Sequence, residues 1–226
     1  MSDIDVGRSD STGERTVVHL LRHGEVFNPT GVLYGRLPDF HLSDLGRAMA
    51  ERVAASLVGR DITVVTASPL DRAQETAAPI AAAHDVSIGV DDNLIEADNV
   101  FEGLRVGVGD GVLKRPQYWH HLRNPFKPSW GEPYVELAAR MRVAITTARE
   151  AARGHEALLV SHQLPIWVAR LDAEKHRFAH DPRRRQCGLA SLTSLTYAGD
   201  RLVAIVYSEP AADLVAKAKD VTARGA

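Results

Sequence analysis

Short apolar runs alternate with longer segments of helical spacing along most of this chain. The first run, Thr16–Leu21 (TVVHLL), is rich in β-branched residues and predicts a buried strand. Asp44–Val58 then carries apolar residues at helical spacing, with Ser43 as a candidate N-cap and Gly59 as a stop. A second apolar strand is predicted over Ile62–Thr66. The remaining predicted elements are a helix over Leu70–His84, a strand over Val86–Val90, a helix over Pro133–Arg153, a strand over Ala157–Val160, a helix through Trp167–Leu171, a hairpin of Leu192–Tyr197 and Leu202–Tyr207, and a closing helix over Pro210–Ala223.

This alternation of strands and helices predicts the α/β fold class. Parallel strands need long crossover connections, which helices usually supply. We therefore expect a three-layer α/β/α sandwich with a mostly parallel central sheet, covered by helices on both faces. The stretch Asp91–Gly131 interrupts the alternation. It is irregular yet keeps apolar anchors such as Phe101 and Trp119, which predicts an active-site excursion rather than a linker.

Polar residues follow three of the predicted strands at the point where each strand ends. They are Arg22-His23-Gly24, Ser68-Pro69-Leu70 and Ser161-His162. In open α/β sheets, ligands bind beyond the carboxyl ends of the strands. The sequence therefore predicts that these residues converge on one edge of the sheet.

The first of these groups has chemistry suited to phosphate. Arg22 offers a rigid fork of donors to a phosphoryl group. His23 offers a neutral imidazole nitrogen that can attack phosphorus. Gly24 lets the backbone approach a substrate without an intervening side chain.

Four motifs of the chain resemble, in the same order, those of the histidine phosphatase superfamily in its phosphoglycerate mutase-like branch: LLRHGE, YGRLPDFHLSDLGRAMA, SPLDRAQETA and LVSHQLPIW. The resemblance extends from about Thr16 to about Ser208. It implies a phosphoglycerate mutase-like fold.

The resemblance also implies roles for four residues. His23 is expected to carry a transient phosphohistidine, and Arg22 and Arg72 are expected to clamp the phosphoryl oxygens. Arg72 falls in the first turn of a predicted helix, whose N-terminal end favours an anion. His162 is expected to bind the phosphate and to stabilise the transition state.

The leaving group needs a proton from a carboxyl that burial or a nearby negative charge keeps protonated. The segment Leu94–Gly103 resembles the family's Glu-bearing stretch, which implies Glu96 as the donor and Glu102 as a structural residue. The spacing is one residue shorter than the family pattern, and Val100 stands where Gly is usual. Asp98 and Glu102 therefore stay open as alternative donors.

Three further residues bear on this site. Asn28 is expected to donate to the phosphate, although its spacing is also one residue short. Arg36 either reaches the substrate or is a surface residue. Gln163 directly follows the second histidine, which disfavours branches of the superfamily that use an Asp there.

We expect neither a metal nor a cofactor. No third ligand of the usual spacing accompanies the pair His23 and His162, and the arginines would crowd a cation. His176 and His180, four residues apart, predict a solvated helix face. The single cysteine, Cys187, is interpreted as a small, partly buried residue. Arg183–Arg185 is interpreted as part of a solvated loop rather than a nucleic-acid patch, since the net charge is only −2.

Composition gives the broad class of the protein. The chain has 226 residues, of which 45% are hydrophobic and 25% charged, as in an ordinary globular protein. We predict a disordered lead-in over residues 1–15 and a single domain over residues 16–226.

The polar start lacks an apolar signal-peptide stretch, and no apolar run approaches the roughly 20 residues of a membrane span. These features predict a cytoplasmic protein that binds neither nucleic acid nor a membrane. The resemblance implies a small phosphorylated substrate as its partner. The oligomeric state stays open, with a dimer as one option.

Phosphatases and mutases of this kind begin with the same phosphohistidine and differ in what accepts the phosphoryl group. Cofactor-dependent mutases of the family carry an Arg-Arg run that leads into consecutive prolines in the long excursion. Nothing of that kind occurs between Asn99 and Gly131. We therefore predict metal-independent hydrolysis of a phosphomonoester. A cofactor-dependent mutase and a catalytically weak phosphate-binding regulatory protein are the alternatives.

Overall fold

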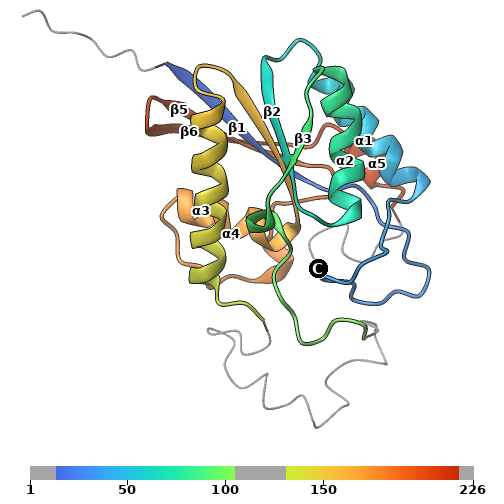
Figure 1. The fold of residues 1–226 in the computed structure, drawn as a ribbon. Helices are drawn as coiled ribbons and strands as arrows, with labels where there is room; N and C mark the ends of the chain where they lie inside the picture. Colours follow the sequence, from blue (N-terminus) through green and yellow to red (C-terminus); the bar gives the residue numbers. More distant parts are fainter. Residues whose placement is uncertain (1–13, 105–130, 219–226) are drawn as a thin grey trace, which may run out of the picture.

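The computed structural model describes residues 14–104 and 131–218 (Figure 1). Its strands are β1 (Arg15–Arg22), β2 (Ile62–Ala67), β3 (Ile88–Val90), β4 (Glu156–Ser161), β5 (Leu192–Ala198) and β6 (Arg201–Ser208). Its helices are α1 (Asp44–Ser56), α2 (Asp71–Ala83), α3 (Tyr134–Ala151), α4 (Gln163–Ala173) and α5 (Ala212–Val215), with short 3-10 turns η1 (Asp92–Leu94) and η4 (Pro182–Arg184).

The strands form one sheet in the order β3-β2-β4-β1-β5-β6. The pairs β3–β2, β2–β4 and β4–β1 are parallel, whereas β5 runs antiparallel to both β1 and β6. The predicted α/β class with a mostly parallel sheet is therefore confirmed, and so is the predicted β5–β6 hairpin.

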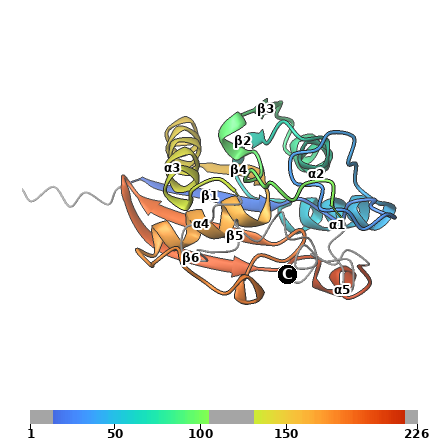
Figure 2. The ribbon, with the colours of Figure 1, turned by 90° about the horizontal axis from the view of Figure 1, so that it is seen from below.

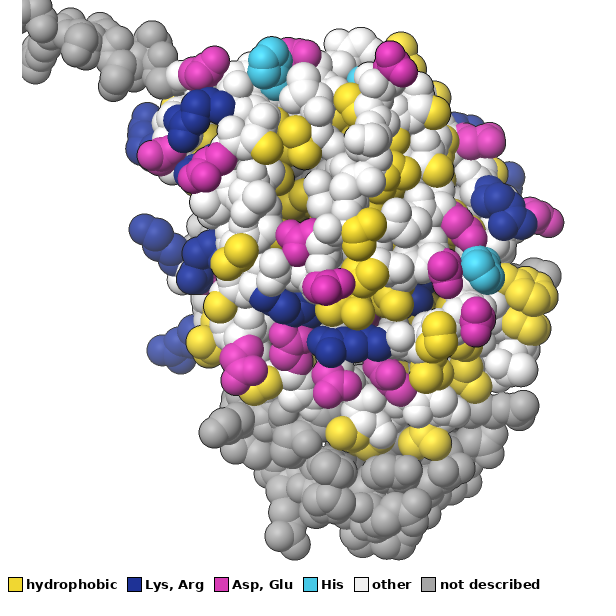
Figure 3. Space-filling model, viewed as in Figure 1, with side chains coloured by type: hydrophobic (Ala, Val, Ile, Leu, Met, Phe, Trp, Pro, Cys, Tyr) yellow, Lys and Arg dark blue, Asp and Glu magenta, His cyan; other side chains and the backbone are white. Residues whose placement is uncertain are grey.

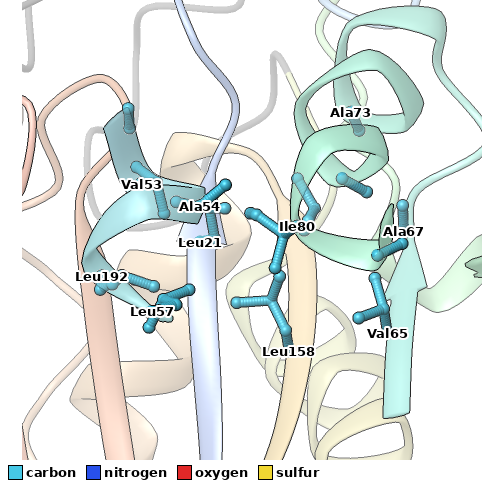
Figure 4. Close-up of a cluster of buried hydrophobic side chains, with 14 of the residues drawn as sticks. Leu21, Val53, Ala54, Leu57, Val65, Ala67, Ala73, Ile80, Leu158 and Leu192 are labelled. Atoms are coloured by element: carbon cyan, nitrogen blue, oxygen red, sulfur yellow. The ribbon is translucent and has the colours of Figure 1, made fainter. Parts of the chain in front are cut away.

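Alternating residues of the central strands bury opposite faces of the sheet. Leu21 of β1 and Leu158 of β4 point to the face of the sheet that α1 and α2 cover, where they pack with Ile80 of α2 (Figure 4). Their neighbours Leu20 and Leu159 pack on the other face, in a cluster with residues of α3 and α4. Figure 2 shows how the helices lie about the sheet. Each such buried leucine contributes about 1.5–3 kcal/mol of transfer free energy. The sheet is thus the middle of three layers, as predicted.

The carboxyl ends of β1, β2 and β4 lie side by side. Arg22 pairs with Ser161 in the parallel register, and the N–H of Ser68 donates to the carbonyl of Val160 at 2.9 Å. The polar residues that follow these three strands therefore do meet at one edge of the sheet.

Some predicted boundaries were wrong. Arg15, assigned to the lead-in, belongs to β1, where it pairs with Ala198. The strand predicted from Val86 begins only at Ile88. Of the predicted closing helix, the described residues up to 218 are α-helical over Ala212–Val215, and the turn that follows is tighter, with the N–H of Lys217 bonded to Leu214. Residues 1–13 and 219–226 lie outside the described part of the chain.

Basic and acidic side chains lie next to one another on the face shown in Figure 3 rather than in separate patches. Among the described residues, no helix combines the length and the apolar character that crossing a bilayer requires.

Candidate active site

His23 directly follows β1 and is 2% exposed. Its backbone N–H donates to the carbonyl of Ser161, the last residue of β4, at 3.2 Å. Its ring Nδ1 lies 2.8 Å from the carbonyl oxygen of Gly24. Because a carbonyl can only accept, Nδ1 carries the proton and Nε2 is left bare.

The surroundings of His23 keep its ring neutral. Burial lowers the pKa of His23 well below its usual range, and the positive charges of Arg72 and Arg22 lower it further. The hydrogen bond to Gly24 opposes this effect without reversing it. His23 therefore presents an unprotonated Nε2 at neutral pH, as a nucleophile requires.

His162 faces His23 from the neighbouring strand end, with the ring centroids 5.1 Å apart. It is the N-cap of α4, and its Nε2 lies 2.8 Å from Oγ of Ser68. Burial and the charge of Arg72 lower the pKa of His162 well below its usual range. Among the described residues its Nδ1 has no hydrogen-bond partner. The site thus contains two neutral histidines.

Two buried arginines complete the centre of the site. Arg22 is 2% exposed, and its Nη1 donates to the carbonyl of Cys187 at 2.8 Å. Arg72, in the first turn of α2, is 1% exposed, and its Nη2 donates to the carbonyl of Gly35. The Arg72 guanidinium also lies 4.8 Å from the ring centroid of Tyr34. Buried cations are costly without a compensating anion, so the pair favours an anionic ligand.

Gly24 has a packing role that the sequence did not indicate. A Cβ atom at Gly24 would lie 2.6 Å from the carbonyl oxygen of Gly46, at the start of α1. Its N–H donates to Oγ1 of Thr76 in α2. The close approach that the structure shows is therefore between the backbones of Gly24 and Gly46, which seats the loop on the helix layer.

Glu96 is half-buried, and its side chain accepts a hydrogen bond from the N–H of Ala97 at 2.9 Å. Burial raises the pKa of the Glu96 carboxyl. The Ala97 N–H and the charges of Arg72, Arg22 and Arg185 oppose this shift without cancelling it. A raised pKa is what a proton donor near neutral pH needs.

Two arginines, joined by one carboxylate, hold the backbone of Glu96 in place. Its carbonyl oxygen accepts from Nε of Arg36 at 2.7 Å and from Nη2 of Arg140 at 3.3 Å. The Glu132 carboxylate joins these two arginines, with contacts of 3.0 Å to Arg36 Nη2 and 2.7 Å to Arg140 Nε. We call Arg36, Glu132 and Arg140 the bridge.

The two alternative donors lie in different settings. The Asp98 side chain is exposed. Oε1 of Glu102 accepts the backbone N–H of Arg36 at 2.8 Å, and its side chain lies where a Cβ of Gly35 would be. Glu102 thus fixes a loop, whereas Glu96 lies among the charges of Arg72 and Arg22.

In the structure, the Asn28 side chain bonds to the backbone of its own loop. Its Nδ2 donates to the carbonyl of Val32 at 2.8 Å, and its Oδ1 accepts the N–H of the same residue at 3.2 Å. The amide therefore closes its own loop, a common use of Asn in turns. Arg36, in turn, is not a free surface residue, because its side chain belongs to the bridge.

Sequence reasoning missed the roles of several polar residues around the site. Nothing in the spacing marked Glu132 or Arg140 as partners of Glu96. The pair His176 and His180 was wrongly placed on a helix, because α4 ends at Ala173. His180 instead lies between Tyr134 and Trp167, with ring centroids 5.8 Å from each.

Cys187 is a buried thiol, and burial raises its pKa to about 11. A thiolate is therefore disfavoured there at neutral pH. Its backbone carbonyl contributes to the site by holding Arg22.

One set of side chains in the described residues has the spacing of a metal site. Ligand atoms of Asp39, His41 and Asp71 lie within 4.8 Å of one another. The Nδ1 of His41 already bonds Glu75, and this hydrogen bond raises the pKa of His41. Asp39 and His41 are exposed, and Asp71 directly precedes Arg72.

Chemically, the site combines a bare imidazole nitrogen, a second neutral imidazole, two buried guanidinium groups and a half-buried carboxyl. Buried polar atoms without partners are rare in native proteins. Among the described residues, Nε of Arg72, Nδ1 of His162 and Nε2 of Gln163 are such atoms. The site is therefore built to surround an oxygen-rich anion.

Known proteins give the family of the chain. A model of the histidine phosphatase superfamily (branch 1) matches residues 18–209. An uncharacterized protein of Mycobacterium tuberculosis (strain H37Rv) is 62% identical over 199 residues, which are 88% of this chain and 98% of the relative. A probable phosphoglycerate mutase, GpmB, of Yersinia pestis is 30% identical over 186 residues, or 80% of this chain and 84% of the relative.

Solved structures of similar proteins have the same fold as this chain. A mycobacterial glucosyl-3-phosphoglycerate phosphatase in complex with VO3 is 25% identical, with a TM-score of 0.65, over 85% of this chain and 96% of that one. The superfamily includes phosphatases and mutases, both of which transfer phosphoryl groups. The chain belongs to branch 1 of the histidine phosphatase superfamily.

Proposed function

We propose that this protein hydrolyses a phosphomonoester through a phosphohistidine on His23. The observation that carries the proposal is the hydrogen bond from His23 Nδ1 to the carbonyl of Gly24, which leaves Nε2 unprotonated. This nitrogen lies among two buried arginines and a second neutral histidine, where the charge of a phosphoryl group is stabilised.

The reaction has two steps in this proposal. First, the lone pair of His23 Nε2 forms an N–P bond while the ester P–O bond breaks, and the Glu96 carboxyl gives its proton to the leaving oxygen. Second, a water oxygen forms a new P–O bond while the N–P bond breaks, and the Glu96 carboxylate accepts the proton of that water. Inorganic phosphate leaves, and both residues return to their starting states.

The remaining groups handle charge. Arg22 and Arg72 are proposed to hold the non-bridging oxygens, the part that metal ions take in other phosphatases. The Ser68 hydroxyl can donate to Nε2 of His162, and that tautomer places the His162 proton on Nδ1. His162 Nδ1 is then a donor for a phosphoryl oxygen.

In this proposal the acceptor of the phosphoryl group is water, whereas in a mutase it is a bound substrate. The lack of an Arg-Arg-Pro run between Asn99 and Gly131 supports hydrolysis. The similar proteins described above include a phosphatase and a probable mutase. Both outcomes must therefore be measured on this chain.

The test is phosphate release from p-nitrophenyl phosphate and small phosphoesters by the purified protein with a chelator present. We expect release, an acid-labile phosphoprotein after rapid quenching, and loss of both in His23→Asn. Undiminished phosphate release by that variant overturns the assignment of His23 as the nucleophile. Primer-dependent conversion of 3-phosphoglycerate to 2-phosphoglycerate without phosphate release indicates a mutase. Phosphate binding with neither reaction indicates a regulatory protein.

A further inference from the structure

Arg185 lies beside the site on the loop between η4 and β5. It precedes by two residues Cys187, whose carbonyl holds Arg22. Arg185 is half-buried, in contrast to its exposed neighbour Arg184. The sequence placed both in a solvated loop, which is wrong for Arg185.

His180 holds the Arg185 guanidinium at one end. The ring Nδ1 of His180 lies 2.6 Å from the carbonyl of Phe178, so Nδ1 carries the proton and Nε2 accepts. Nε of Arg185 donates to that Nε2 at 2.9 Å. The tilted contacts of His180 with Tyr134 and Trp167 fix the ring in turn. The direction of the guanidinium is thus set by an aromatic cluster and not by an acid.

Gln163 lies at the other end. Its Oε1 is 3.4 Å from Nη1 of Arg185, which assigns the oxygen of the amide to this side, since two donors cannot face each other. The amide nitrogen of Gln163, 7% exposed as a residue, has no partner among the described residues. Gln163 directly follows His162, so the residue that carries this unused donor adjoins the phosphoryl site.

Arg185 is also electrostatically joined to the site. Burial lowers its pKa, and the charge of Arg22 lowers it further, whereas Glu96 raises it. Within the described residues, no carboxylate forms an ion pair with Arg185. A half-buried guanidinium without a counter-ion, beside an unused amide donor, lacks an anion.

We propose that Arg185 and Gln163 form a second anion subsite, and that the substrate is a phosphomonoester carrying a second anionic oxygen group, either a carboxylate or a second phosphate. This inference rests on the proposed phosphatase function. The phosphoryl group occupies the centre formed by His23, Arg22 and Arg72, and the second anion extends from it toward Arg185.

Two matched substrate pairs test the subsite. 3-Phosphoglycerate differs from glycerol 3-phosphate by a carboxylate, and fructose 1,6-bisphosphate differs from fructose 6-phosphate by a phosphate. We expect wild-type kcat/KM to favour the more anionic member of one pair at least about tenfold, as a single charged bidentate contact allows. The pair that shows the preference identifies the anion.

Arg185→Gln is expected to reduce that preference about tenfold, and Arg185→Lys to reduce it less. The exposed Arg184→Gln is the matched control and should leave the preference unchanged. If Arg185 acted only on the Glu96 proton, both members of a pair would lose the same factor, and the subsite would be overturned. A wild-type preference below about threefold for both pairs overturns it too, whether or not the variants fold. No hydrolysis of any ester, including p-nitrophenyl phosphate, is instead a failure of the phosphatase proposal.

Discussion

Two buried histidines, His19 within β1 and His23 directly after it, differ in how many of their ring nitrogens are hydrogen-bonded. His19 has both ring nitrogens engaged, Nδ1 with Oγ of Ser194 at 2.7 Å and Nε2 with Oε2 of Glu156 at 2.9 Å. Glu156 also forms an ion pair with Arg60. His23 has only Nδ1 engaged, and its Nε2 has no hydrogen bond within the described residues.

We call His19, Ser194, Glu156 and Arg60 the His19 cluster, which stabilises the fold. The residues around His23 form a second cluster, whose open hydrogen bonds fit a ligand. Around His19, donors, acceptors and charges are matched within the protein, so burial is compensated. Around His23, buried donors of Arg72, His162 and Gln163 lack partners. Residue type does not distinguish the two clusters, since both contain a histidine, an arginine and a glutamate. What distinguishes them is which hydrogen bonds the fold leaves unmade.

The largest expected effect comes from replacing each histidine in turn, because one change should affect catalysis and the other stability. His23→Asn should lower kcat/KM for p-nitrophenyl phosphate by at least about a thousandfold, because it removes the nucleophile. His19→Asn should lower the free energy of unfolding by about 2 kcal/mol, because it leaves Glu156 and Ser194 short of partners. Urea unfolding and kinetics per folded molecule measure the two effects. A large loss of activity in folded His19→Asn would contradict the separation.

The next largest effect is expected from Glu96→Gln. An alkyl phosphate needs a proton on its leaving oxygen, whereas p-nitrophenolate leaves without one. The variant should lose about a hundredfold in kcat on an alkyl ester and less than about tenfold on the nitrophenyl ester. Asp98→Asn, at the exposed alternative, should not alter the ratio of the two rates. Equal losses on both esters in Glu96→Gln would exclude it as the donor.

The His19 cluster should respond to acid through stability. Burial alone would raise the pKa of Glu156, but hydrogen bonds from His19 and Arg60 outweigh it and lower the pKa to about 2. The folded value lies below the usual 4.5, so the cluster contributes its full stability above about pH 5 and loses it as the pH falls toward 2. After discounting for the exposed Arg60, we expect about 2 kcal/mol.

Urea unfolding of wild type and Glu156→Gln across this range measures that contribution. The variant should be less stable at pH 7, and the difference should shrink as the pH approaches 2. A difference that is independent of pH would show that the carboxylate charge is not what stabilises the cluster.

Much of the site could be predicted because it depends on strand ends. A parallel sheet brings the residues after β1, β2 and β4 to one edge, so Arg22, His23 and His162 could be grouped from their positions alone. Arg72 follows because α2 begins just after β2. These placements need only the sheet topology and not the side-chain contacts.

The missed features depend on contacts between segments far apart in the sequence. Asn28 bonds within its own loop, a choice that spacing does not reveal. Arg185 differs from Arg184 only because His180 and Gln163 lie beside it. The helix predicted over His176 ended early, at Ala173, because local pattern places helix ends poorly.

The smallest expected effect concerns the bridge, which shares features of both clusters. Like the His19 cluster it is an internally matched ion network, with Glu132 between Arg36 and Arg140. Unlike that cluster it ends on the carbonyl of Glu96, so we expect it to position the proposed donor.

Glu132→Gln removes the negative charge that joins the two arginines but keeps the size and shape of the side chain. We expect about a tenfold loss of kcat on an alkyl phosphate and a smaller one on p-nitrophenyl phosphate, as for a displaced catalytic group. Glu136→Gln, on the exposed first turn of α3, is the control. If Glu132→Gln only lowered the unfolding free energy, with both esters affected alike, the bridge would resemble the His19 cluster and stabilise the fold without positioning Glu96.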